Sequence, residues 1–95
     1  MTSHQWRERT DEGNTRLFRA NRHSGEWEFM SKLKKDPYWE HLDELPLGDL
    51  ETFREILWNK HLRRRVPLKQ VEEIDGIIKV RRRRKRGISA GNKKD

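Results

Sequence analysis

The sequence predicts an α+β fold in which a short antiparallel meander of three strands packs on an αα-hairpin. Turn-forming clusters recur about 12 residues apart in the first half of the chain, which is typical of short meandering strands. Two later stretches carry apolar side chains at helical spacing, which is typical of amphipathic helices. The net charge lies after residue 80 and marks the end of the predicted fold.

Residues 15–45 are predicted to form the strands, because they contain five of the eight aromatic residues. Turn-forming residues occur at 21–25 and 34–37. Between these turns, Trp27 and Phe29 alternate with polar residues, as in a strand with one buried face. The expected strands lie near residues 15–21, 26–33 and 38–42.

The same region also fits a helical interpretation. Ser24 can cap a helix in which Trp27, Met30 and Leu33 follow one another at spacings of three, and Pro37 suits the first position of a second helix. The segment also has few β-branched residues, which weakens the strand interpretation. The alternative fold is therefore an all-α bundle of three to four helices.

A helix is predicted over residues 49–64, after the break at Pro46–Asp49, with Asp49 as its N-cap. Its buried stripe is expected to consist of Leu50, Phe53, Ile56 and Leu57. Trp58 and Leu62 form a second apolar strip on the flank of this helix. They are the candidate surface for a protein partner or a homodimer, since Trp is enriched among interface hot spots.

A second helix is predicted over residues 67–80, because Pro67 suits a first helical position. Its apolar stripe consists of Leu68, Val71, Ile74 and Ile78. A link of two to four residues predicts that the two helices form an antiparallel hairpin. The sequence thus predicts one small folded domain over residues 15–80, between a flexible N-terminus at 1–14 and a disordered basic tail at 81–95.

Charge is distributed unevenly along the chain. Residues 1–80 hold 15 Lys or Arg and 15 Asp or Glu, whereas residues 81–95 hold eight Lys or Arg and one Asp. Six consecutive cations gain nothing from one another and are suited to the phosphates of nucleic acid, whose counterions they displace. The candidate nucleic-acid contacts are Arg81, Arg82, Arg83, Arg84, Lys85 and Arg86.

A second basic cluster, Arg63, Arg64 and Arg65, falls at the link between the helices. In an antiparallel hairpin this link lies at the opposite end from residues 81–86. The cluster is therefore expected to remain separate from the tail, to finish the first helix favourably for its dipole and to pair with acidic residues.

The pattern argues against an enzyme, a metal site or a cofactor. The chain has no Cys, its four His fall in separate segments without metal-ligand spacing, and its Gly residues form no phosphate-binding loop. The absence of Cys favours an intracellular protein, cytoplasmic or associated with the nucleoid or nucleus. No apolar run approaches the length of a membrane span.

The sequence therefore predicts a small non-enzymatic accessory protein that contacts DNA or RNA through its tail, without reading base sequence. The alternative function is a protein-interaction module or homodimer that uses Trp58 and Leu62. For the tail itself, the alternatives are a solvated end without function, a nuclear-import signal and a contact with anionic lipid headgroups.

Overall fold

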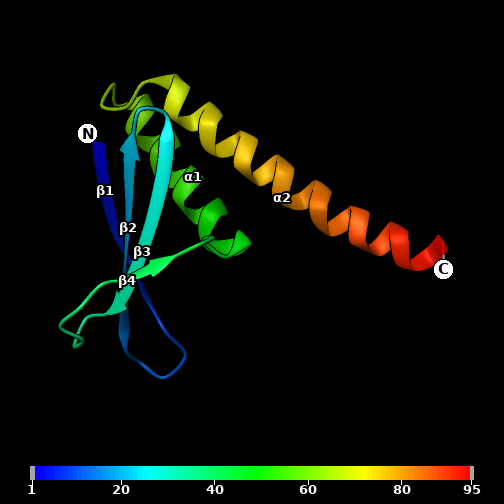
Figure 1. The fold of residues 1–95 in the computed structure, drawn as a ribbon. Helices are drawn as coiled ribbons and strands as arrows, with labels where there is room; N and C mark the ends of the chain where they lie inside the picture. Colours follow the sequence, from blue (N-terminus) through cyan, green and yellow to red (C-terminus); the bar gives the residue numbers. More distant parts are fainter. Residues whose placement is uncertain (1, 95) are drawn as a thin grey trace. The chain divides into compact units, whose positions relative to one another are not determined.

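A computed structural model describes the backbone of residues 2–94 and the side chains of residues 2–84. It contains a four-stranded antiparallel sheet and two helices, which confirms the α+β class and gives no support to the all-α alternative (Figure 1). The chain divides into two compact units, residues 1–45 with the sheet and residues 46–95 with the helices. The packing of the sheet on the helices remains a prediction.

The sheet has the strand order β1-β2-β3-β4, and every neighbouring pair is antiparallel. The three strands expected from the turn spacing are confirmed as β2, β3 and β4. At the β2–β3 turn, Ser24 and Gly25 both have positive φ angles, of 52° and 83°, which suits a tight two-residue hairpin turn. The strands are β1 Thr2–Arg9, β2 Thr15–His23, β3 Glu26–Leu33 and β4 Glu40–Leu42.

Strand β1 corrects the prediction of a flexible N-terminus over residues 1–14. It pairs with β2 along its whole length, and Trp6 stacks on Phe18 across the strands with ring centroids 5.3 Å apart. Backbone pairing and the burial of Trp6, which is 8% exposed, compensate for the polarity of the segment. Gly13, with a φ angle of 82°, allows the turn that returns the chain into β2.

The buried side chains of the sheet all lie on one face. The register places Trp6, Phe18 and Ser31 in one row, and residues directly opposite one another in a sheet point to the same side. The next row contains further buried side chains, His4, Ala20 and Phe29. The opposite face, called the open face below, carries mainly polar and charged side chains.

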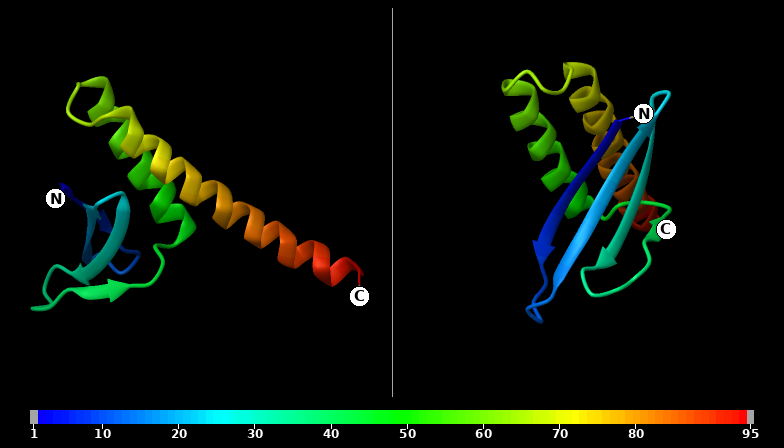
Figure 2. Two further views of the ribbon diagram at one scale, coloured as in Figure 1. Left: turned by 45° about the horizontal axis from the view of Figure 1, so that its top comes forward. Right: turned by 90° about the vertical axis from the view of Figure 1, so that its left-hand side faces the viewer.

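Helices α1 (Leu47–Leu62) and α2 (Leu68–Lys94) form the predicted antiparallel hairpin (Figure 2). Both predicted stripes supply its core, although Ile56 is only half-buried and Leu68 is 44% exposed. Helix α1 starts earlier than expected: Pro46 occupies the N-cap position, and Asp49 lies in the first turn, where its charge favours the helix dipole. The buried residues are Leu50, Phe53, Leu57, Val71, Ile74 and Ile78.

The link between the helices spans residues 63–67, longer than the two to four residues expected. Arg64 adopts a left-handed conformation with a φ angle of 60°. The Arg65 amide donates to the Lys60 carbonyl over 2.9 Å, and the Arg64 amide donates to the His61 carbonyl over 2.8 Å. This pair of bonds is a Schellman motif, which normally has Gly at the left-handed position.

Replacing Arg64 by glycine is therefore expected to stabilise the protein. A non-glycine residue in this conformation costs about 1 kcal/mol, and Gly removes most of that cost. Chemical denaturation should give a higher midpoint for Arg64→Gly than for the unaltered chain. Arg63→Gly is the matched control, because Arg63 has an ordinary φ angle of −90° and its replacement should not stabilise the protein.

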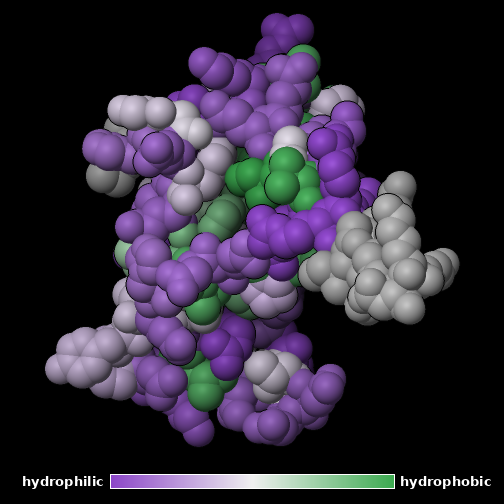
Figure 3. All heavy atoms as spheres, turned by 45° about the vertical axis from the view of Figure 1, so that its right-hand side comes forward, coloured by the Kyte–Doolittle hydropathy of each residue, from purple (hydrophilic) through white to green (hydrophobic). Residues whose placement is uncertain are grey.

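Helix α2 also corrects the prediction of a disordered tail, since its backbone continues through Lys94. Arg and Lys are good helix formers, and no Pro follows Pro67. Charged residues make up 41% of the chain, and hydrophilic residues make up most of the face shown in Figure 3.

Candidate functional site

The basic run begins where α2 passes the start of α1. Arg82 forms an ion pair with Glu51, which lies in the second turn of α1. A second ion pair joins the helices nearer to the link between them. There, Arg54 of α1 donates to Asp75 of α2 over 2.8 Å. The hydrogen bond that Arg54 donates to Asp75 raises the pKa of Arg54. Arg82 therefore has a carboxylate partner within the hairpin, so it is less available to an external phosphate.

The cations after Arg82 lie on the part of α2 that runs beyond α1 (Figures 1 and 2). Arg83 and Arg84 are exposed, whereas Arg81 is half-buried. The side chains of Lys85 and Arg86 lie outside the described residues. The sequence places Arg83, Arg84, Lys85, Arg86, Lys93 and Lys94 after Arg82, with Asp95 as the one acid.

Arg63, Arg64 and Arg65 lie at the other end of the hairpin and are exposed. The structure does not bear out their expected pairing with acids, since no carboxylate within the described part of the chain lies at ion-pair distance from them. Burial lowers the pKa of the neighbouring Lys60, and the positive charge of Arg65 lowers it further. This cluster and the tail are therefore two separate positive regions.

Trp58 and Leu62 are one turn apart on α1. The guanidinium of Arg54 lies 5.4 Å from the centroid of the Trp58 ring, and the His61 ring lies 5.5 Å away. Trp58 is half-buried, whereas Leu62 is 63% exposed. Trp58 thus already has neighbours within α1, and Leu62 is the part of this candidate surface that faces solvent.

The sequence interpretation missed a positive region on the open face of the sheet. The register aligns Arg7, Leu17 and Lys32 in one row across three strands. Neighbouring strands are about 4.8 Å apart, so the backbones at Arg7 and Lys32 are separated by roughly 10 Å. Arg9 lies in the next row, opposite Thr15, whose carbonyl accepts a hydrogen bond from the Lys34 amide.

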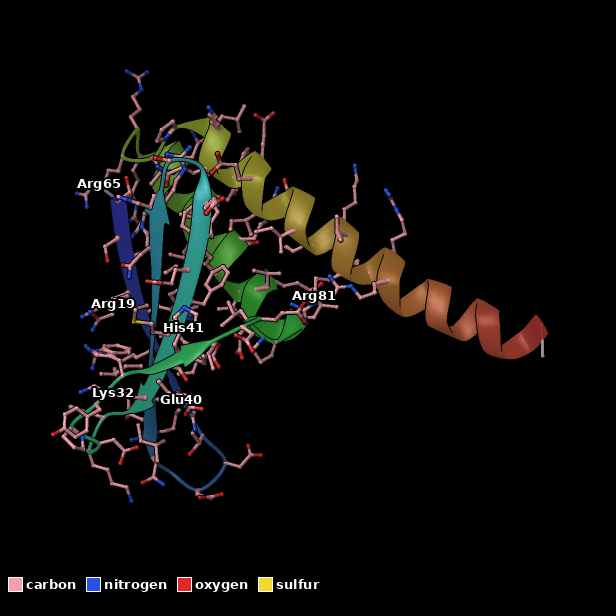
Figure 4. The ribbon with its side chains drawn as sticks, viewed as in Figure 1. Arg19, Lys32, Glu40, His41, Arg65 and Arg81 are labelled. Atoms are coloured by element: carbon pink, nitrogen blue, oxygen red, sulfur yellow. The ribbon has the colours of Figure 1, made fainter. Side chains whose placement is uncertain are left out.

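Arg19 and Lys32 are brought together by Trp39, which directly precedes β4. The Arg19 guanidinium lies 4.4 Å from the centroid of the Trp39 ring, and the Lys32 ammonium lies 5.4 Å from it. Both distances are within the range of a cation–π interaction. Arg19 and Lys32 project to the same side of the sheet (Figure 4). We call Arg7, Arg9, Arg19, Lys32 and Lys34 the sheet cations.

The other end of the open face carries acidic residues instead. Glu28 accepts a hydrogen bond from Asn21 and lies 3.4 Å from His41. A hollow of about 520 Å³ adjoins them. Within the described residues, however, no three His, Cys, Asp or Glu side chains gather in a group that could hold a metal ion.

Comparison with protein-family models, with curated proteins and with solved structures finds no match for this chain. Across the described residues, neither helix is long and apolar enough to cross a membrane.

Proposed function

We propose that the protein is a non-enzymatic accessory protein that associates with nucleic acid through the C-terminal end of α2, without reading base sequence. The observation that carries this proposal is the concentration of the net charge in residues 81–95. Such a protein would be cytoplasmic or associated with the nucleoid or nucleus.

The course of α2 supports the proposal. Arg82 is paired with Glu51 near the start of α1, and the cations that follow it lie towards the C-terminal end of α2. Arg83 and Arg84 are exposed there. A helix turns by 100° per residue, so consecutive cations point in different directions around the axis. Such an arrangement suits contact with phosphates on more than one side, rather than one fixed arrangement of bases.

The chemistry of arginine also supports a phosphate ligand. Its guanidinium forms two parallel hydrogen bonds to a phosphate, and it is weakly hydrated, so it gives up less water than an ammonium group does. Five of the six cations from Arg81 to Arg86 are Arg. Each phosphate neutralised also releases condensed counterions, which provides the main driving force for non-specific binding.

A pair of charge-matched variants tests the proposal. The tail variant carries Arg83→Gln, Arg84→Gln and Arg86→Gln, and the link variant carries Arg63→Gln, Arg64→Gln and Arg65→Gln. Each removes three positive charges, so the two variants have the same net charge. Binding of a mixed-sequence DNA duplex can be followed by fluorescence anisotropy at several salt concentrations.

The tail variant is expected to bind more weakly and to reduce the slope of log affinity against log salt by about 2.7, at roughly 0.9 per lost phosphate contact. The link variant should keep the affinity and slope of the unaltered chain. Equal losses in the two variants would show that net charge, and not the tail, determines binding.

A further inference from the structure

We propose that the open face of the sheet and the exposed segment before β4 form a second binding site, in which the sheet cations contact the phosphates of single-stranded nucleic acid and Tyr38 stacks on a base. This site uses residues of the first unit and does not depend on the tail. It adds a preference for unpaired strands, which the tail alone does not provide.

Arg19 and Lys32 form the centre of this site. They share the ring of Trp39, yet the polar partners that the structure gives them are neutral. Arg19 donates to the side-chain oxygen of Gln5 over 3.3 Å, and Lys32 donates to the backbone carbonyl of Asp36 over 3.0 Å. Neither partner is a carboxylate, so the positive charges of Arg19 and Lys32 are both available to attract an anion beside them.

The rest of the sheet cations extend this positive region. For none of the five does an ion pair with an acid occur among the residues whose side chains are described. The acids of the open face lie at its other end, where Glu28 is engaged by Asn21 and His41. A shallow hollow of about 320 Å³, whose lining includes Arg7, Leu17 and Lys34, gives the positive end a concave surface.

Tyr38 provides the aromatic surface. It follows Pro37 in the segment before β4 and is 83% exposed, which is unusual for a side chain with such a large apolar area. Trp39, its neighbour in sequence, is occupied by the two cations, so Tyr38 is the aromatic ring available to a ligand. Stacking of a base on an exposed aromatic ring contributes sequence-tolerant affinity to single-strand binding.

The combination of groups favours an unpaired strand over a duplex. In a duplex the bases are already paired and stacked, whereas in a single strand they are free to turn outwards onto an aromatic side chain. Cations on the sheet face for the backbone, with an exposed ring in the adjoining segment for a base, therefore recognise the features that a duplex conceals.

Tyr38→Ala in the full chain tests the proposal, with a short oligothymidylate and a duplex of the same length as probes. The variant is expected to bind the single strand about five- to 150-fold more weakly, the effect of losing one stacked base. Its affinity for the duplex should not change. Tyr38→Phe keeps the ring and should bind both probes as the unaltered chain does.

Lys32→Gln tests the phosphate contact separately. It should lower the slope of log affinity against log salt on the single strand by about 0.7, and Lys69→Gln, an exposed lysine of α2, should leave that slope unchanged. Unaltered single-strand binding by Tyr38→Ala, or an equal loss on both probes, would overturn the proposal. The tail is tested by binding to a duplex and the sheet site by binding to a single strand. The results can therefore rule out one binding site without ruling out the other.

Discussion

Replacing Phe53 by alanine is expected to unfold the helical hairpin. Phe53 is fully buried near the centre of α1, and Leu50 and Leu57, one turn away on either side, are buried as well. Removing a buried Phe side chain costs about 3–5 kcal/mol, because apolar contacts are lost and a cavity remains. A unit of this size has only about 2.5–7.5 kcal/mol of stability, at roughly 0.05–0.15 kcal/mol per residue. The loss is therefore comparable with the whole stability of the hairpin.

Far-UV circular dichroism measures the outcome. The variant should lose much of its helical signal at room temperature, or melt at a far lower temperature than the unaltered chain. Leu62→Ala is the matched control: it also removes a large apolar side chain from α1, but Leu62 is 63% exposed and the cost should stay within about 0.5 kcal/mol. Similar melting of the two variants would contradict the assigned core.

The helices could be predicted in large part because their information is local. Apolar residues at spacings of three and four identified the stripe that includes Phe53 and the stripe that includes Ile74. Most of these residues are buried, whereas Ile56 is half-buried and Leu68 is exposed. Their ends were predicted less well. The start of α1 was predicted too late in the sequence, because Asp49 resembles an N-cap although it lies in the first turn. The left-handed conformation of Arg64 could not be predicted, because nothing distinguishes this residue from its neighbours in a run of arginines.

Strand β1 escaped prediction because its stability depends on a distant partner. Taken alone, residues 2–9 are polar and contain one large apolar side chain, Trp6. Only pairing with β2, which places Trp6 against Phe18, makes the segment a strand. The alternation of Ser3, Gln5 and Arg7 with His4 and Trp6 was the available signal.

The sheet cations could not be recognised from the sequence for a similar reason. Arg7, Arg19 and Lys32 are far apart along the chain, and residues 1–45 hold eight Lys or Arg against nine Asp or Glu. The strand register brings these cations to one end of the open face and leaves Glu28 at the other. Charge counting along the chain detects the contiguous tail and misses a positive region assembled from three strands.

The affinity of the intact chain for duplex DNA is expected to depend steeply on salt. Six cations follow Arg82 in the sequence. If all six neutralise phosphates, affinity should fall on the order of 10³-fold between about 50 and 200 mM salt, because each contact contributes roughly 0.9 to the slope. Duplexes of different sequence should show the same affinity and the same fall with salt, since phosphates carry no base information.

The most direct test of the central claim is this salt slope, measured for the intact chain and for a chain that ends after Arg82. The shorter chain retains the ion pairs that join Arg82 to Glu51 and Arg54 to Asp75 across the hairpin. We predict a slope of about −5 for the intact chain and a slope near zero for the shortened chain. Equal slopes for the two chains, or no dependence on salt in the intact chain, would contradict binding through the tail.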